Sequence, residues 1–140
     1  MERYRILPHT ADGKFQSYGN TLEEAFGNAA LALASLMWDW STVEPKIRHF
    51  VHAAGADREQ LLVKYLGEVI YLFETKRFLL GRVDGLKIRP QFAGFSLEAV
   101  LAGETLSPGR EITGDVKAVT YHDLTIEEGD GFTVQVVVDM

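Results

Sequence analysis

Two aspartates near opposite ends of the chain are the residues best suited to chemistry. Asp12 closes a short polar stretch that begins at His9, and Asp139 ends an apolar run and is followed by Met140. If the first and last strands of the fold are neighbours, these carboxylates converge with the α-carboxylate. Such a cluster requires a cation or a basic side chain to neutralise it. We place Lys117 beside the two aspartates as that basic residue.

One interpretation of this triangle is a site for a hard cation. Asp12, Asp139 and a backbone or terminal oxygen are the ligand types that Ca²⁺ and Mg²⁺ prefer. The sequence contains no contiguous signature such as an EF-hand loop. The other interpretation is a solvated lysine and a solvated aspartate on the surface, which require no function. The residue types alone leave both open.

The histidines and the absence of cysteine argue against other metal chemistry. Without cysteine there is no thiolate ligand or nucleophile, and no HExxH pattern is present. His49 and His52 lie three apart in a predicted strand, so they point to opposite faces and do not chelate one ion. We expect His9 and His122 to orient a backbone group or a carboxylate.

Other familiar catalytic patterns are also missing. The sequence has no GxxxxGK[ST] loop, no GxGxxG after a strand and no GxSxG turn. A stand-alone hydrolase would need a nucleophile and a base, and no such pair is evident.

Composition predicts one domain over residues 1–140. The chain is 46% apolar and 24% charged, which is ordinary for a globular protein. With 14 basic and 20 acidic residues, the net charge of −6 argues against direct binding to a nucleic-acid backbone. No apolar run approaches the roughly 20 residues of a membrane span. Because the first residues lead into a strand and not an apolar signal core, we expect a cytoplasmic protein.

Two amphipathic helices are predicted among many strands. Thr21 and Asp57 are the expected N-caps, with Glu24 and Gln60 at capping-box spacing. The first helix is predicted to run to Asp39. The predicted strands cover residues 3–7, 14–18, 43–54, 78–83, 85–88, 92–102, 115–121, 124–127 and 132–138. This pattern favours an α+β fold: a two-layer sandwich with both helices on one face of a largely antiparallel sheet.

Several runs, in order, resemble the archease family. They are His-Thr-Ala-Asp at 9–12, Tyr-Gly at 18–19, Thr-Leu-Glu-Glu-Ala-Phe at 21–26, Asn-Ala-Ala-Leu-Ala-Leu at 28–33, Ile-Tyr-Leu-Phe-Glu-Thr at 70–75, Lys-Ala-Val-Thr-Tyr-His at 117–122 and Val-Asp at 138–139. The chain departs from the family where Tyr65-Leu66-Gly67-Glu68 replaces Trp-Leu-Asn-Glu. Gly67, in mid-helix, predicts a close approach to another backbone.

The resemblance implies a fold and a function. The fold is a two-layer α/β sandwich with a strand-helix-strand-strand module. The function is that of a non-catalytic activator of the GTP-dependent RNA ligase, which joins a 2′,3′-cyclic phosphate or 3′-phosphate RNA end to a 5′-hydroxyl end. Archeases promote guanylylation of the ligase and its multiple turnover in tRNA splicing or RNA repair.

The resemblance also implies a site and its partners. A divalent ion, expected to be Ca²⁺ with Mg²⁺ or Mn²⁺ as alternatives, would be held by Asp12, Asp139 and the carbonyl of Met140. Lys117 matches a functional lysine, and we add His9 and His122 to the residues expected to act in ligase activation. The expected partner is the ligase, with RNA reached only through it, and neither DNA nor a membrane is bound directly. The alternative is a metal-independent, chaperone-like interaction domain.

Overall fold

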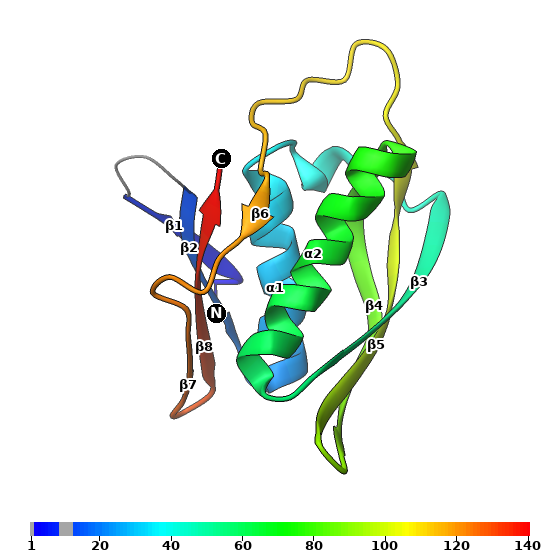
Figure 1. Cartoon of the computed structure of the whole chain (residues 1–140). Helices are drawn as coiled ribbons and strands as arrows, with labels where there is room; N and C mark the ends of the chain where they lie inside the picture. The colour runs from blue at the N-terminus through cyan, green and yellow to red at the C-terminus, as the bar shows by residue number, and fades with distance from the viewer. Residues whose placement is uncertain (1, 9–12) are drawn as a thin grey trace.

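The computed structural model describes residues 2–8 and 13–140, and it places two helices between two antiparallel sheets (Figure 1). The first sheet has the order β1-β2-β8-β6, and β7 also pairs with β8. Its strands are β1 (Tyr4–Leu7), β2 (Gly13–Gly19), β6 (Ala118–Val119), β7 (Thr125–Glu128) and β8 (Phe132–Asp139). The second sheet has the order β3-β5-β4, with β3 (Ile47–Gly55), β4 (Phe78–Gln91) and β5 (Gly94–Thr105).

The two helices begin at the predicted caps. In α1 (Leu22–Ser35) the Glu24 amide donates to Thr21 Oγ1 at 3.1 Å, and in α2 (Arg58–Lys76) the Gln60 amide donates to Asp57 Oδ1 at 2.8 Å. These side chains satisfy amides that have no partner within the helix. Neither described helix is both long and apolar enough to cross a membrane.

The first helix ends earlier than predicted. After Ser35 the chain tightens into a turn in which the Trp38 amide donates to Ala34 O at 2.9 Å. Met37 and Trp38 then point into the core, and Trp38 Nε1 donates to Leu80 O at 2.9 Å. A short 3₁₀ helix, η1 (Trp40–Thr42), follows. Anchoring two large side chains in the core therefore replaces the last predicted turn of α1.

The α+β class, the antiparallel pairing and the helix pair packed on a sheet are confirmed, but the strands divide between two sheets. Buried residues lie all round α1, from Ala25 and Phe26 to the run Ala29–Ala34. A helix that is buried all round requires cover on both sides. The first sheet covers one side of the helix pair and the second sheet covers the other (Figure 1).

The strand-rich half differs from the prediction in two places. The predicted strands 78–83 and 85–88 form one strand, β4, with irregular register between Leu80 and Arg82 and between Asp84 and Lys87. The predicted strand 115–121 is reduced to Ala118–Val119, because the preceding residues form a loop.

The middle of α2 also differs from the sequence-based prediction. A Cβ built on Gly67 meets no atom within 4 Å among the described residues, so the predicted close backbone approach is wrong. Tyr65 is fully buried and stacks on Phe26 with ring centroids 6.2 Å apart. Its hydroxyl has no hydrogen-bond partner in the described part of the chain. Burial raises the pKa of the Tyr65 phenol far above its ordinary value.

Candidate functional site

Three of the predicted site residues, Lys117, Asp139 and Met140, lie where β8 ends. We call this place the C-terminal corner and include Gly13, which lies beside them on β2. Here β8 lies between β2 and β6, with Gly13 opposite Val138 and Ala118 opposite Asp139. The Lys117 amide donates to the carbonyl oxygen of Asp139 at 2.8 Å. The last strand therefore pairs with the strand that follows the polar stretch, and β1 lies on the far side of β2.

Close packing fixes the position of Met140 at this corner. A Cβ on Gly13 would lie 2.9 Å from Val138 Cγ2 and 3.0 Å from both Leu36 Cδ1 and Met140 Sδ. A Cβ on Gly114 would lie 3.1 Å from Met140 Cε and would collide with the Leu36 carbonyl oxygen. The Met140 side chain thus packs at the end of α1, beside two glycines with no room for a larger residue.

The charged side chains of the corner point to solvent. Lys117 and Asp139 are both exposed, and the ion pairs found among residues 2–8 and 13–140 do not include one between them. Within the same residues, no three His, Asp or Glu side chains are grouped closely enough to hold a metal ion. His9 and Asp12 lie outside the described residues, so the expected pair of carboxylates is not tested.

A loop, residues 106–117, carries the chain from the second sheet to Lys117, and hydrogen bonds from Arg110 and Thr113 hold it in place. The Arg110 guanidinium donates to the Glu104 carboxylate and, at 2.6 Å, to Thr42 Oγ1. The hydrogen bond from Arg110 holds the pKa of the Glu104 carboxyl below its usual value. Further along, the Thr113 amide donates to Met37 O at 2.8 Å. Lys117 therefore leaves a loop that is already held against η1 and the end of α1.

His122 lies in a small charged cluster that the sequence analysis missed. Its Nε2 is 3.5 Å from Asp123 Oδ2, and Lys14 Nζ is 3.7 Å from the same oxygen. Asp123 adopts φ +52°, a left-handed conformation that Asp enters more readily than most residues. Lys14 follows Gly13 on β2, so the contact depends on the register of β2, β8 and the turn before β7. No local pattern in the sequence signals it.

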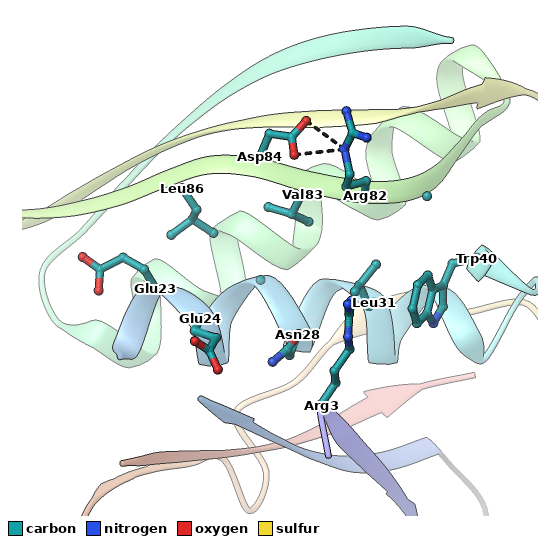
Figure 2. A pocket seen from close by; sticks show the side chains of 12 residues that line it. Arg3, Glu23, Glu24, Asn28, Leu31, Trp40, Arg82, Val83, Asp84 and Leu86 are labelled. Atoms are coloured by element: carbon teal, nitrogen blue, oxygen red, sulfur yellow. Dashed lines mark hydrogen bonds and ion pairs between the residues drawn. The ribbon is translucent and has the colours of Figure 1, made fainter. Parts of the chain in front are cut away.

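A separate cavity of about 490 Å³ lies between α1 and β4 (Figure 2). Leu31 and Val83 contribute apolar surface, and the Arg3 guanidinium lies 5.3 Å from the centre of the Trp40 ring. Its other lining residues include carboxylates and the ion-paired Arg82 and Asp84. Charges of both signs without a nucleophile give this cavity no evident chemistry.

Comparisons with known proteins agree over the whole length of the chain. The model of the archease protein family matches residues 4–140. The protein archease of Methanosarcina acetivorans is 40% identical over 141 residues, which cover 99% of this chain and 97% of the relative. The protein archease of Pyrobaculum neutrophilum is 44% identical over 140 residues, which cover 98% of this chain and 95% of the relative.

A solved structure shows the same fold. The solution structure of Methanobacterium thermoautotrophicum protein 1598 superposes with a TM-score of 0.86 at 33% sequence identity. The match covers 100% of both chains. Sequence and structure lead to the same conclusion, that this chain belongs to the archease family.

Proposed function

We propose that this protein is a non-catalytic activator of the GTP-dependent RNA ligase that joins 3′-phosphate or 2′,3′-cyclic phosphate RNA ends to 5′-hydroxyl ends. It promotes guanylylation of the ligase and its repeated turnover in tRNA splicing or RNA repair, in the cytoplasm. Family membership over residues 4–140 supports this function. The observation that supports the site is the hydrogen bond from the Lys117 amide to the Asp139 carbonyl oxygen, which holds the backbones of these two residues side by side.

The residues we assign to a divalent ion are Asp12, Asp139 and Met140 through its carbonyl oxygen. Asp139 is exposed and has an oxygen donor of the kind that hard cations prefer. Gly13 and Val138 are paired, and each is bonded in sequence to one of the two aspartates. Because Ca²⁺ takes about 6–8 oxygen ligands, water or the ligase would supply the rest.

The corner would act by placing positive charge next to the ligase nucleotide. Attack of the ligase histidine on the GTP α-phosphate forms a nitrogen–phosphorus bond and releases pyrophosphate. Negative charge on the phosphate oxygens increases during this step, and nearby cations stabilise that charge. A bound divalent ion supplies such charge. Lys117 adds an ammonium group on a long exposed side chain whose backbone is fixed beside Asp139.

His122 and His9 have supporting roles in this proposal. His122 lies beside Asp123, which also contacts Lys14, so it helps to fix the turn that follows β6. A protonated His122 would strengthen that contact. His9 belongs to the His-Thr-Ala-Asp run and would support the segment that carries Asp12.

The decisive experiment follows covalent guanylylation of the ligase from the same source under multiple-turnover conditions. We expect Asp12→Asn, Asp139→Asn and Lys117→Met each to reduce stimulation by about tenfold or more, as for loss of one charge-stabilising group. Asp130→Asn and Lys76→Met are the matched controls, because both residues are exposed and lie outside the corner. Full stimulation by Asp12→Asn and Asp139→Asn would remove the metal corner from the mechanism.

Calcium itself is tested without the ligase. At a calcium concentration of 100 times Kd, binding to the folded state stabilises it by about 2.7 kcal/mol. For a domain of this size each kcal/mol raises Tm by roughly 2–4 °C. We expect calcium to raise Tm for the wild type but not for Asp139→Asn. If the aspartates and Lys117 formed only a structural salt bridge, Asp139→Asn would lower Tm in the absence of calcium. Added calcium would then have no effect on the wild type.

A further inference from the structure

One face of the second sheet has no covering layer among residues 2–8 and 13–140. The helices pack on the inner face of β3, β5 and β4, and the opposite face is open (Figure 1). We call this face the outer sheet face. Directly paired residues share a face, so the register gives its four rows: Arg48, Ala102 and Arg82; Phe50, Val100 and Asp84; His52, Glu98 and Lys87; Ala54, Ser96 and Arg89.

Aromatic side chains are exposed on and beside this face. Phe50 is 71% exposed in the row that contains Val100, and His52 follows two residues later on the same side of β3. Phe92, in the turn between β4 and β5, is fully exposed. Leaving two phenylalanine rings in water forfeits the free energy that burial would give. Such exposure at an open surface is typical of a binding site.

The outer sheet face is positive although the chain is acidic. Its four Lys and Arg side chains outnumber its two carboxylates, so its charge is 4 − 2 = +2, while the whole chain carries −6. Arg82 pairs with Asp84 and Arg89 with Glu98, each at 3.0 Å. Arg48 and Lys87 are therefore the surplus charges, and neither has an ion-pair partner in the described residues.

The hairpin end of the face is hollowed. A cavity of about 620 Å³ there has His52, Gln91, Phe92 and Ser96 among its lining residues, together with Lys64 of α2. Gln91 Nε2 donates to Ser96 Oγ at 3.0 Å, so hydrogen-bonding groups lie beside the exposed ring. The positive face thus continues into a hollow that offers an aromatic ring, polar groups and a further lysine.

We propose that the outer sheet face binds single-stranded RNA. Bases would stack on Phe50 and Phe92, with His52 between them, and phosphates would lie near Arg48 and Lys87. Single-strand sites combine this kind of aromatic platform with positive charge along the backbone path. The choice of RNA over DNA rests on the function proposed above, whereas the stacking and phosphate contacts do not.

Charge explains why this occupant is favoured over a second copy of the chain. Two outer sheet faces packed together would bring two positive surfaces into contact, which is unfavourable. The net charge of −6 predicts no direct contact with nucleic acid, but that number averages over the whole surface. Exposed charges farther apart than about 8 Å are largely screened at physiological salt. A bound strand would therefore respond mainly to the local positive face.

The test is fluorescence anisotropy of a labelled twelve-residue oligouridine with the full chain. If three phosphates are neutralised, raising salt from 50 to 200 mM should weaken binding roughly 20-fold. We expect Phe50→Ala and Phe92→Ala each to weaken binding at least about fivefold, because each removes a stacking platform. Lys87→Glu should weaken RNA binding by a larger factor at low salt than at high salt.

Matched controls use the same substitutions away from the face. Tyr71 is an exposed aromatic residue of α2, and Lys76 is an exposed lysine in its last turn. Tyr71→Ala and Lys76→Glu should leave RNA binding unchanged. Circular dichroism melting establishes that every variant is folded, so that lost binding reports the face and not unfolding.

Several results would overturn this inference. One is no RNA binding by the wild type at roughly 100 µM, the weak end of non-specific affinities. Another is an equal loss of RNA affinity in Phe50→Ala and Tyr71→Ala. A third is tighter binding of oligothymidine DNA than of the RNA. If the wild type binds no RNA, and Phe50→Ala no longer pulls down the ligase, the face is a protein-binding surface. A wild type that fails to bind RNA but stimulates guanylylation rejects this inference alone, whereas RNA binding without stimulation rejects the proposed function alone.

Discussion

The outer faces of the two sheets use their side chains differently. On the first sheet Gln16 Nε2 donates to Gln135 Oε1 at 3.0 Å, and Tyr18 OH donates to Gln16 Oε1 at 3.0 Å. Gln135 Nε2 in turn donates to Asp123 O at 2.8 Å. Polar groups on this face therefore bond to one another across β2, β8 and the turn before β7.

The second sheet also has paired groups, such as Arg82 with Asp84, but it leaves other side chains without partners. Phe50 stands in water, and Arg48 and Lys87 have no ion-pair partner in the part of the chain that the structure describes. A face that satisfies itself stabilises the fold, whereas a face with exposed rings and surplus charge is available to a ligand. In our two proposals the first sheet would act at its end, in the C-terminal corner, and the second across its open side.

The largest expected effect breaks the second sheet alone. A Cβ on Gly103 of β5 would collide with the Leu79 carbonyl oxygen of β4, so Gly103→Ala must push the two strands apart. We expect a loss of about 3 kcal/mol in the free energy of unfolding, measured with urea, as for severe overpacking. The control is Gly67→Ala, where a Cβ meets nothing and helix propensity favours alanine by about 1 kcal/mol. An unchanged stability for Gly103→Ala would mean that β4 and β5 are not packed as described.

A smaller effect sharpens the contrast between the two faces. Gln135→Ala removes two hydrogen bonds on the first sheet and should lower the free energy of unfolding by about 1 kcal/mol. Phe50→Ala removes a side chain that is 71% exposed and should change the free energy of unfolding by less than about 0.5 kcal/mol. Both values come from the same urea titrations. The reverse order would show that Phe50 has a structural role and would weaken its assignment to a ligand.

A third effect, no larger than that of Gln135→Ala, concerns the link between the two regions, the contact of Arg110 with Glu104. Because the pKa of Glu104 is lowered in the folded state, the contact stabilises the protein above the ordinary carboxyl pKa. That stability is lost as pH falls through the lowered pKa. Glu104→Gln should therefore lower Tm at pH 7, by an amount corresponding to no more than about 1 kcal/mol, and match the wild type in acid. A difference that stays constant down to pH 3 would exclude the ion pair as its cause.

Local chemistry made parts of this fold predictable from the sequence. Thr21 and Asp57 mark the starts of the helices because their side chains bond to amides only three residues away. Strand alternation placed His49 and His52 on opposite faces, and His49 packs inward on Phe78 with ring centroids 4.6 Å apart. Each of these predictions needs only a few neighbouring residues.

The parts that could not be predicted depend on distant residues. α1 is buried all round because a sheet lies on each side of it, whereas its alanines suggest only that packing is close. The contact between Lys14 and Asp123 and the rows of the outer sheet face depend on strand register. For the corner, the sequence could place Lys117 near Asp139 through a family resemblance, while the hydrogen bond between their backbones comes from the pairing of β6 with β8.

The position of β8 between β2 and β6 also bears on how the protein forms on the ribosome. Gln16 and Gln135 meet across a sequence separation of 119 residues, so β2 must wait for nearly the whole chain before it gains this neighbour. Pairing at such separation is slow, and an exposed strand edge invites aggregation until it forms. The hairpin of β4 and β5 needs no such wait. A nascent chain would thus acquire its open, positive face early and its C-terminal corner last, so a protein truncated before β8 would lack the proposed activating site.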